Sequence, residues 1–474
     1  MFEPIGLIIL AAGLASLAMG RTAPMVLVVL CSGLGAAAAL LIGSANIQPA
    51  HVVLLLAVAA MVARPEGAAF FMRTLASSPP AVWLLLLVVY GVTTAYFIPR
   101  LMAGATDIVP LGASAFDDTG DTVPLGPVSS NFTQSVYMTA NLFCFVATLH
   151  AASSDKGFRL VALGLLGLAG FNAALAVVDV ATYWTGTQAL LDPIRNARYT
   201  LHHEEQIAGL KRIVGGMPEA SAFARFTLGL MAFSAMLWMS GLWTRASGLL
   251  ALASFALVLL STSTTGMVGL IPVAGVLYAA AAGKAFLGRP TGQSVTLVAV
   301  LPAVAAAIGL VLLASEELRT AILDYLDLLV FSKASSNSGL ERAAFNAIAL
   351  QNFRDSYGFG VGLGTVRTSS LPIALLSHVG IPGTLFYLGF LAAVAWPRRQ
   401  RMEPLRSGVR AGALIGCFAL ICGDLIAAPN IEQGLIFYVL AGLAAARPAR
   451  KTVPALPPPV PVESGERAIA LSAR

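Results

Sequence analysis

The sequence predicts an all-α, polytopic integral membrane protein, a helical bundle of about 12–13 transmembrane helices with two large helical outer loops. Hydrophobic residues make up 57% of the 474-residue chain, charged residues only 11%, and the mean hydropathy is +0.82. A soluble domain carries about 25% charged residues, so this chain has too little charge to solvate a water-facing surface. The apolar residues fall in runs of spanning length, and the basic residues recur in alternate connections.

Thirteen apolar runs are candidate spans, since about 20 apolar residues cross the hydrocarbon core. Two of the runs are short, so we predict twelve or thirteen spans. The first run has no basic segment before it and no clear cleavage site, which favours a retained helix over a signal peptide. The runs cover residues 4–20, 24–43, 50–64, 80–99, 135–151, 157–182, 221–240, 245–262, 266–283, 294–314, 372–396, 409–428 and 432–446.

The basic residues predict the orientation of the bundle, because short cytoplasmic loops are enriched in Lys and Arg. If the connection that holds Arg21 is cytoplasmic, alternation places seven positively charged segments on that side. The short connections on the other side, 44–49, 263–265 and 429–431, contain no Lys or Arg. The pattern is therefore consistent with itself.

This orientation predicts that three long loops, 100–134, 183–220 and 315–371, face away from the cytoplasm. Long loops are translocated largely regardless of their charge. Residues 1–446 then form one transmembrane domain. The proline-rich residues 447–474 are predicted to be a disordered cytoplasmic tail.

The predicted outer loops contain arginines, although Lys and Arg are usually enriched in cytoplasmic loops. Guanidinium groups bind phosphate through two parallel hydrogen bonds, so one interpretation is anion binding. The alternative is a solvated surface whose charges largely balance. For any single arginine the solvated surface is favoured, and for the set we favour anion binding. The candidates are Arg195, Arg198, Arg212, Arg342, Arg354 and Arg367.

Asp179, Arg225 and Asp424 lie inside apolar runs, near the predicted outer ends of their helices. Intramembrane charge is costly and usually faces a partner or a cavity. A structural Asp–Arg pair is at least as well supported as a catalytic role. We hypothesise that Asp424 or Asp179 pairs with a cation, most favourably Arg225.

The third outer loop predicts two helices. Residues 318–331 are apolar on one side and too short to span, which is typical of an interfacial helix. Residues 339–354 predict a second helix, with Arg342 and Asn346 on one face. The run FGVGLG, 359–364, then supplies glycines for a tight turn or for close approach of the backbone to a ligand.

The histidines and cysteines predict no metal site and no cofactor. His202 and His203 are adjacent and cannot share one face of a helix, so we interpret them as a solvated polar patch, although either one can serve as a general base. All four cysteines lie in apolar runs, at spacings typical of neither a zinc site nor a disulfide framework. We expect them to be buried thiols.

Three segments resemble the O-antigen ligase and O-antigen polymerase superfamily of bacterial membrane glycosyltransferases. They are RIVGGMPEASAFA (212–224), LSTSTTGMVGL (260–270) and SGLERAAFNAIALQNFRDSYGFGVGLG (338–364), the last followed by SSLPIALLSHVGIPG (369–383). The third is the most specific, because it combines a loop helix, a glycine run and re-entry into the membrane.

This chain departs from the family pattern at two places, and the second, the absence of the ligase histidine, favours a polymerase over a lipid A-core ligase. The family's Ser-rich turn often carries an Arg where this chain has Thr265. Ligases of the family carry a His about nine residues before the glycine of the re-entry segment, where this chain has Ser369 and Ser370. His378 lies nearer the re-entry glycines and does not match that position.

The resemblance implies inverting, metal-independent glycosyl transfer from a polyprenyl-diphosphate-linked glycan, at the periplasmic face of a bacterial inner membrane. It assigns Arg212 and Arg342 to the departing diphosphate. Contacts to glycan or diphosphate are assigned more weakly to Arg195, Arg198, Arg225, Arg354 and Arg367. The general base stays open among His202, Glu341 and Asp355.

The implied partners are the lipid-linked glycan, membrane lipid, a chain-length regulator and a flippase, with no nucleic acid. Two alternatives stay open. One is a ligase that transfers glycan to a lipid or protein acceptor. The other is a transporter of lipid-linked sugars, which would place its binding groups on broken helices near the middle of the membrane.

Overall fold

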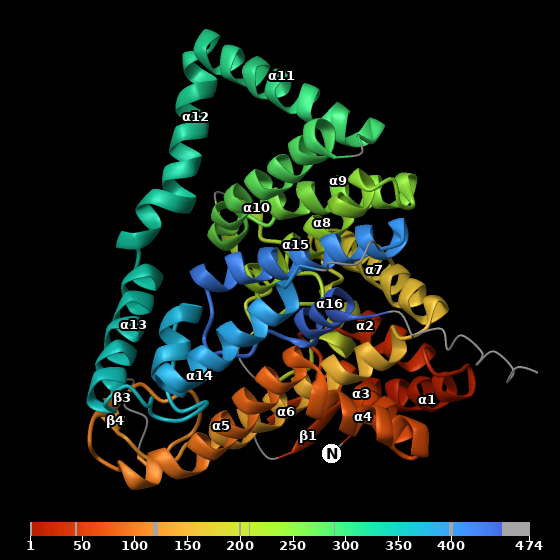
Figure 1. The fold of residues 1–474 in the computed structure, drawn as a ribbon. Coiled ribbons are helices and arrows are strands. Elements are labelled where there is room, and N and C mark those ends of the chain that lie inside the picture. The colour runs from red at the N-terminus through yellow and green to blue at the C-terminus, as the bar shows by residue number, and fades with distance from the viewer. Residues whose placement is uncertain are drawn as a thin grey trace, which may run out of the picture.

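The computed structural model describes residues 2–42, 45–116, 122–198, 201–207, 209–288, 290–397 and 402–447. The predicted tail lies, except for Arg447, outside the described residues. Most of the described chain is helical, and most of the helices lie side by side in one bundle (Figure 1). Within the described ranges the strands form three two-stranded antiparallel hairpins, β1–β2, β3–β4 and β5–β6.

Thirteen of the described helices follow the predicted apolar runs in order, and three helices, at 65–77, 316–326 and 337–355, lie outside those runs. The helices are α1 (Pro4–Ala18), α2 (Ala23–Cys31), α3 (Pro49–Val62), α4 (Pro65–Ser77), α5 (Pro79–Leu101), α6 (Ser129–Ala151), α7 (Asp155–Thr185), α8 (Ala220–Met239), α9 (Thr244–Leu260), α10 (Thr264–Ala282), α11 (Gly292–Ala314), α12 (Glu316–Leu326), α13 (Asn337–Asp355), α14 (Leu371–Ala395), α15 (Pro404–Ile426) and α16 (Leu435–Ala445). The strands are β1 (Leu40–Ile42), β2 (Ala45–Ile47), β3 (Asp107–Ile108), β4 (Val123–Pro124), β5 (Gln206–Ile207) and β6 (Leu210–Lys211).

Seven helices of the described chain are long and apolar enough to cross a membrane: α5, α7, α8, α10 with the π turn that follows it, α11, α14 and α15. The count is eight if α3 and α4, which meet at an angle of 105°, are one broken span. Three shorter helices, α1, α9 and α16, are apolar too. The prediction of an α-helical, multi-pass membrane protein is confirmed at this level.

The predicted span 24–43 is not one helix. The α2 helix ends at Cys31, and the next residues pair with the loop before α8 instead. The Ala36 N–H donates to the Gly216 carbonyl at 2.8 Å, and the Ala38 N–H to the Asn196 side chain at 2.9 Å. Irregular backbone is tolerated inside membrane proteins where other protein segments satisfy its hydrogen bonds, and the loop before α8 supplies such bonds here.

The α8 and α15 helices form the centre of the bundle and pack through glycines. A Cβ atom on Gly229 would lie 2.7 Å from the Leu420 side chain, and one on Gly423 would lie 2.7 Å from the Arg225 side chain. Small residues let membrane helices approach closely, which brings their polar groups into contact. In the apolar window of α8, 83% of the residues are buried, against 0% for α11.

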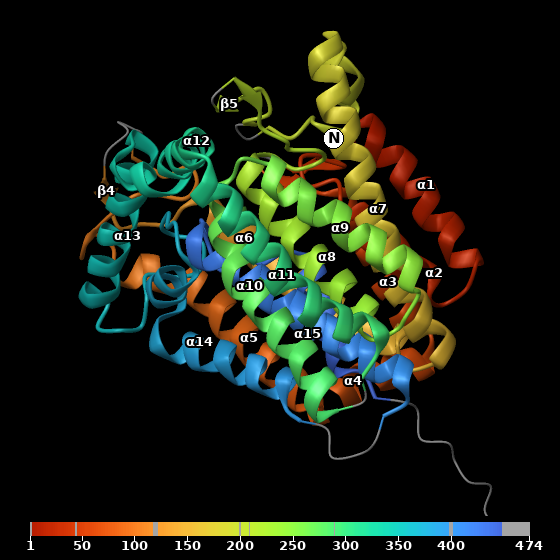
Figure 2. The same cartoon turned by 90° about the horizontal axis from the view of Figure 1, so that it is seen from above.

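The two predicted loop helices are present as α12 and α13. Figure 1 shows α11 and α12 leading away from the bundle and α13 returning to its end, beside β3 and β4. In Figure 2 the same end of the bundle carries α12, α13 and β4. The predicted interfacial helix continues from α12 through a π turn at Asp327–Phe331. The three long loops begin at the C-terminal ends of α5, α7 and α11 and end at the N-terminal ends of α6, α8 and α14.

Candidate functional site

A single carboxylate holds the loop between α7 and α8 in place. Asp179 is buried near the end of α7, and its Oδ1 accepts a hydrogen bond from Arg195 Nη2 at 2.7 Å. Its Oδ2 accepts from the backbone N–H groups of Val214 at 2.8 Å and Gly215 at 3.1 Å. Lys211 Nζ lies 3.5 Å from Oδ1. The hypothesis that Asp179 pairs with a cation is thus confirmed, with Arg195 and Lys211 in place of Arg225.

Lys211 is buried, and no separate role was predicted for it. Its ammonium group donates to the carbonyls of His203 and Arg212, both at 2.7 Å, and lies over the Tyr183 ring at 5.3 Å from the centroid. Burial lowers the pKa of Lys211, and the negative charge of Asp179 opposes that shift. The charges of Lys211 and Arg195 are therefore used inside the protein, which favours a structural role for both.

Arg212, His202 and Glu205 meet at the hairpin β5–β6. Arg212 Nη1 pairs with Glu205 Oε2, and the Arg212 N–H donates to the Glu205 carbonyl at 3.1 Å. His202 Nδ1 lies 3.0 Å from Glu205 Oε1, and its side chain is 47% exposed. A carboxylate that accepts from Nδ1 leaves Nε2 free to take up a proton, the arrangement of an oriented general base.

The predicted pair between Arg225 and Asp424 is confirmed. Arg225 Nη2 donates to Asp424 Oδ2 at 2.6 Å and to the Gln433 carbonyl at 3.0 Å, and its Nε pairs with the other Asp424 oxygen. Gln433 Nε2 also donates to Asp424 Oδ2 at 3.1 Å, and Gln433 Oε1 accepts from the Tyr387 hydroxyl at 2.9 Å. This network joins α8, α14 and α15.

Glu432 is a residue that sequence reasoning missed. It is half-buried beside this network, and its Oε1 accepts from the Gly434 N–H at 2.7 Å and from Asn141 Nδ2 at 3.2 Å. The signal was present in the sequence, because the segment PNIEQG (429–434) places three polar side chains, Asn430, Glu432 and Gln433, where two apolar runs meet.

The Ser-rich turn of the family resemblance lies against α8. Ser261, Thr262, Ser263 and Thr265 are all buried between α9 and α10. A Cβ on Gly266 would lie 3.0 Å from Ala224, the residue before Arg225. The turn is therefore a neighbour of the Arg225–Asp424 pair.

The α14 helix is broken at Gly380, whose φ is 59° and ψ −163°. Pro382 follows and has no amide hydrogen, so the His378 carbonyl has no partner within the helix. The glycine run supplies one, because the Gly362 N–H donates to the His378 carbonyl at 3.1 Å and the Val361 N–H to the Ser377 carbonyl at 2.7 Å.

The glycines of this run allow its backbone to lie close to the backbone of α14. Gly360 has a φ of +80°, and a Cβ there would lie 2.7 Å from the Gly380 nitrogen. His378 Nδ1 accepts from the Gly364 N–H at 3.1 Å, and its Nε2 lies 2.8 Å from the Val366 carbonyl, so Nε2 carries the hydrogen. The glycine run therefore packs against the break in α14. His378 stabilises this contact because both of its ring nitrogens form hydrogen bonds to the segment 364–366.

Arg367 and Arg342 are both associated with the part of α13 that carries Phe345. The Arg367 guanidinium stacks over the Phe345 ring at 5.2 Å from the centroid. Arg342 precedes Phe345 by one helical turn of α13 and is half-buried. Asn346 fixes the register by accepting from the Ser369 N–H at 2.9 Å. Neither guanidinium has a carboxylate partner in the part of the chain that the structure describes.

The segment after Arg367 lies against the end of α15 that carries Asp424. The Thr368 N–H donates to the Pro429 carbonyl at 3.2 Å, and the Ser370 hydroxyl to the Leu425 carbonyl at 3.1 Å. These bonds bring the α13 arginines to the same end of the bundle as the Arg225–Asp424 pair.

The remaining candidates are dispersed. Arg354 and Glu341 are exposed on α13, and Arg198 is exposed beside β2, where its N–H donates to the Asn46 side chain at 2.9 Å. Asp355 uses both oxygens, accepting from Thr106 at 2.6 Å and from Gln351 at 2.7 Å. Asp355 thus ties α13 to the loop before β3, and its geometry suits a general base less well than that of His202.

The comparisons with known proteins add no relative. No model of a protein family matches the chain, and no curated protein matches it. The chemistry of this end of the bundle is therefore argued from its residues.

Proposed function

We propose that the protein polymerises polyprenyl-diphosphate-linked oligosaccharide repeat units into O-antigen or exopolysaccharide, at the outer face of the bacterial inner membrane. One observation carries the proposal: Arg367 stacks on Phe345, Arg342 lies one helical turn before Phe345, and neither arginine has a carboxylate partner among the described residues. Two uncompensated guanidinium groups attract a multiply charged anion, and their forks match diphosphate oxygens. The Phe345 ring beside them offers an apolar face for a sugar.

The proposed reaction is a single displacement. The hydroxyl of the acceptor sugar attacks the anomeric carbon of the donor, and the bond from that carbon to the diphosphate oxygen breaks. The electron pair leaves with the diphosphate, so the configuration inverts. Arg342 and Arg212 stabilise the charge that develops on the leaving group, since preorganised cations act most strongly where charge appears. The diphosphate is already a good leaving group, so the proposal requires no metal.

The acceptor proton passes to a base, and we assign this role to His202. Glu205 lies 3.0 Å from its Nδ1 and orients the ring. Glu341 is the second candidate, because it is exposed on the helix that carries Arg342. Arg354 and Arg198 would contact outer parts of the glycan.

The proposal includes the topology of twelve or thirteen spans, with the loops 100–134, 183–220 and 315–371 in the periplasm. An 11-residue helix such as α16 is about 17 Å long, too short to cross about 30 Å of hydrocarbon. In this topology α16 and the irregular segment before it cross together. A flippase would deliver the substrate, and a chain-length regulator would limit the product.

A transporter of lipid-linked sugars is the second candidate, since α14 is broken within its length. In transporters the groups freed by such a break bind the substrate. Here the glycine run satisfies the Ser377 and His378 carbonyls, so the break offers no free carbonyl there. The unpaired arginines lie instead at the end of the bundle, which favours an enzyme.

The test is to incubate purified protein with lipid-linked oligosaccharide units. A ladder of products supports the polymerase, and a single transfer to another acceptor indicates a ligase. Movement of the units across vesicles without new bonds indicates a transporter. Arg319→Lys is a suitable control for arginine variants, because Arg319 lies in the same loop on α12 and is paired with Glu316 at 3.3 Å.

A further inference from the structure

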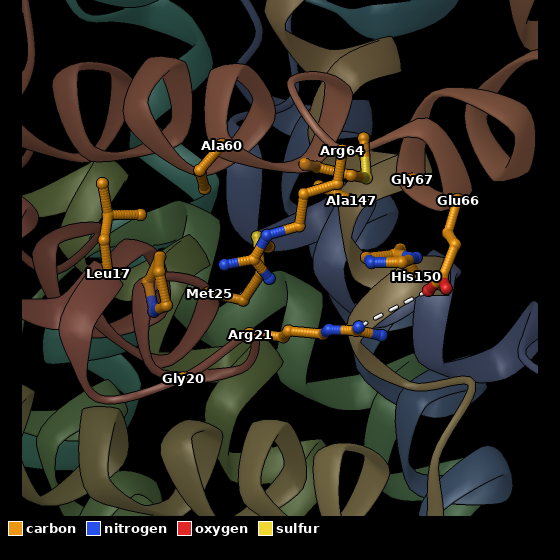
Figure 3. Close-up of a pocket in the computed structure, with 13 residues that line it drawn as sticks. Leu17, Gly20, Arg21, Met25, Ala60, Arg64, Glu66, Gly67, Ala147 and His150 are labelled. Atoms are coloured by element: carbon orange, nitrogen blue, oxygen red, sulfur yellow. Dashed lines mark ion pairs between the residues drawn. The ribbon is translucent and has the colours of Figure 1, made fainter.

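A hollow lies at the other end of α6 from the glycine run. Ser130, in the first turn of α6, binds the Gly364 carbonyl at 2.6 Å, whereas His150, in its last turn, lines the hollow. The turn between α1 and α2 and the bend between α3 and α4 form the remaining walls (Figure 3). The charge pattern predicts that this end faces the cytoplasm.

Three nitrogen-bearing side chains line the hollow. Figure 3 shows Arg21 and Arg64 projecting into it from two different elements, with His150 beside them. Glu66 lies 3.5 Å from Arg21, but the two side chains are 60% and 82% exposed, so the pair is weak. Arg64 has no carboxylate partner within the described ranges, and His150 Nδ1 is buried there without a hydrogen bond. The hollow therefore has excess positive charge.

The other walls of the hollow are apolar. Leu17, Met25, Ala57 and Ala60 line it beside the arginines. The first turn of α4 lies at the rim, and the positive end of a helix dipole favours an anion. Apolar side chains next to cations suit a ligand that is anionic at one end and apolar at the other. Free phosphate has no apolar part and fits this lining less well.

We propose that this hollow binds the headgroup of an anionic phospholipid of the inner leaflet. Arg21 and Arg64 hold the phosphate oxygens, and His150 donates from Nδ1. The first carbons of an acyl chain lie along Leu17 and Ala60. Basic pockets between membrane helices on the cytoplasmic side bind acidic headgroups by this chemistry. The site is independent of glycosyl transfer at the other end of the bundle.

Native mass spectrometry of the purified full-length protein tests the proposal, with phosphatidylglycerol, phosphatidylcholine and inorganic phosphate as the probes. We expect preferential binding of phosphatidylglycerol. Replacing Arg21 and Arg64 together by Gln should weaken it by about fivefold for each arginine removed. Arg73→Gln is the matched control, because Arg73 is exposed on α4 and does not line the hollow.

Glu66→Gln removes the acid that competes for Arg21, so it should strengthen the binding of phosphatidylglycerol. A gain of this kind cannot arise from misfolding. Equal binding of the two lipids, unchanged affinity in the double variant or weaker binding by Glu66→Gln would each overturn the proposal. Inorganic phosphate that competes as strongly as phosphatidylglycerol would mean a site for free anions and would overturn the assignment to a lipid.

Discussion

Two groups of charged residues at the loop-bearing end of the bundle differ in their partners. The inner charge cluster consists of Asp179, Arg195, Lys211, Arg225 and Asp424, in which each cation meets a carboxylate. The outer arginine group consists of Arg342, Arg354 and Arg367, for which the described residues supply no carboxylate. Buried charge must be paired, because its desolvation is costly. Cations left unpaired nearer the surface remain available to a ligand.

The largest effect is expected from breaking the inner charge cluster. Asp179→Ala leaves two buried cations without their counter-ion and two backbone N–H groups without their acceptor, and loss of one partner of a buried pair costs about 3–5 kcal/mol. We expect low abundance and a lower unfolding temperature in detergent. Asp192→Ala is the control, because Asp192 is exposed in the same loop. Equal stability of the two variants would contradict a structural role for the cluster.

Substitution in the outer arginine group should instead spare the fold and remove activity. Arg342→Lys keeps the charge but loses the fork geometry, and loss of one preorganised donor lowers a rate by about 10²–10³. We expect abundant protein that forms little polymer, measured by the yield and length of product on a gel. Arg212→Lys should behave in the same way.

Arg319→Lys is the control for both substitutions and should be silent. Full-length polymer from the variants of both Arg342 and Arg212 would refute the diphosphate role. The outer arginines would then be solvated loop charges.

The contact between the glycine run and α14 can be tested with two alanine substitutions. Gly358 and Gly360 have φ values of +81° and +80°, so an alanine would cause similar backbone strain at either position. Only at Gly360 would the new Cβ meet the backbone of Gly380, at 2.7 Å, whereas at Gly358 it meets the Ile381 side chain at 3.3 Å. We expect Gly360→Ala to lower the free energy of unfolding by about 1–3 kcal/mol more than Gly358→Ala. Equal losses would mean that the run does not need this close approach.

The smallest effect is expected at Arg225. Arg225→Lys keeps a charge opposite Asp424 but loses the hydrogen bond to the Gln433 carbonyl, which is worth about 1 kcal/mol. A thermal unfolding curve in detergent should show a small decrease with normal abundance. Loss of polymer formation at normal stability would move Arg225 from the inner charge cluster to the substrate site.

Several features could be predicted from local sequence. The apolar runs predicted the long helices, and the patterns of 318–331 and 339–354 predicted α12 and α13. The Arg225–Asp424 pair was predictable because few charged residues lie inside apolar runs and such charges require partners. The arginines of the outer arginine group could be singled out from the sequence, because Arg is usually enriched in cytoplasmic loops and these lie in predicted outer loops. The sequence could not show that they have no carboxylate partner.

The sequence by itself therefore determined that the protein is an apolar helical membrane protein, the order of its helices and the residues that carry charge. Composition and periodicity are local properties, so they can be read without the tertiary structure. Tertiary structure decided that α2 stops at Cys31, that α14 is held across its break by the glycine run, and that Asp179 takes Arg195 and Lys211. Each of these depends on hydrogen bonds or ion pairs between segments far apart in the chain. No local pattern records which distant group will satisfy a buried donor or acceptor, so only the packed bundle could show it.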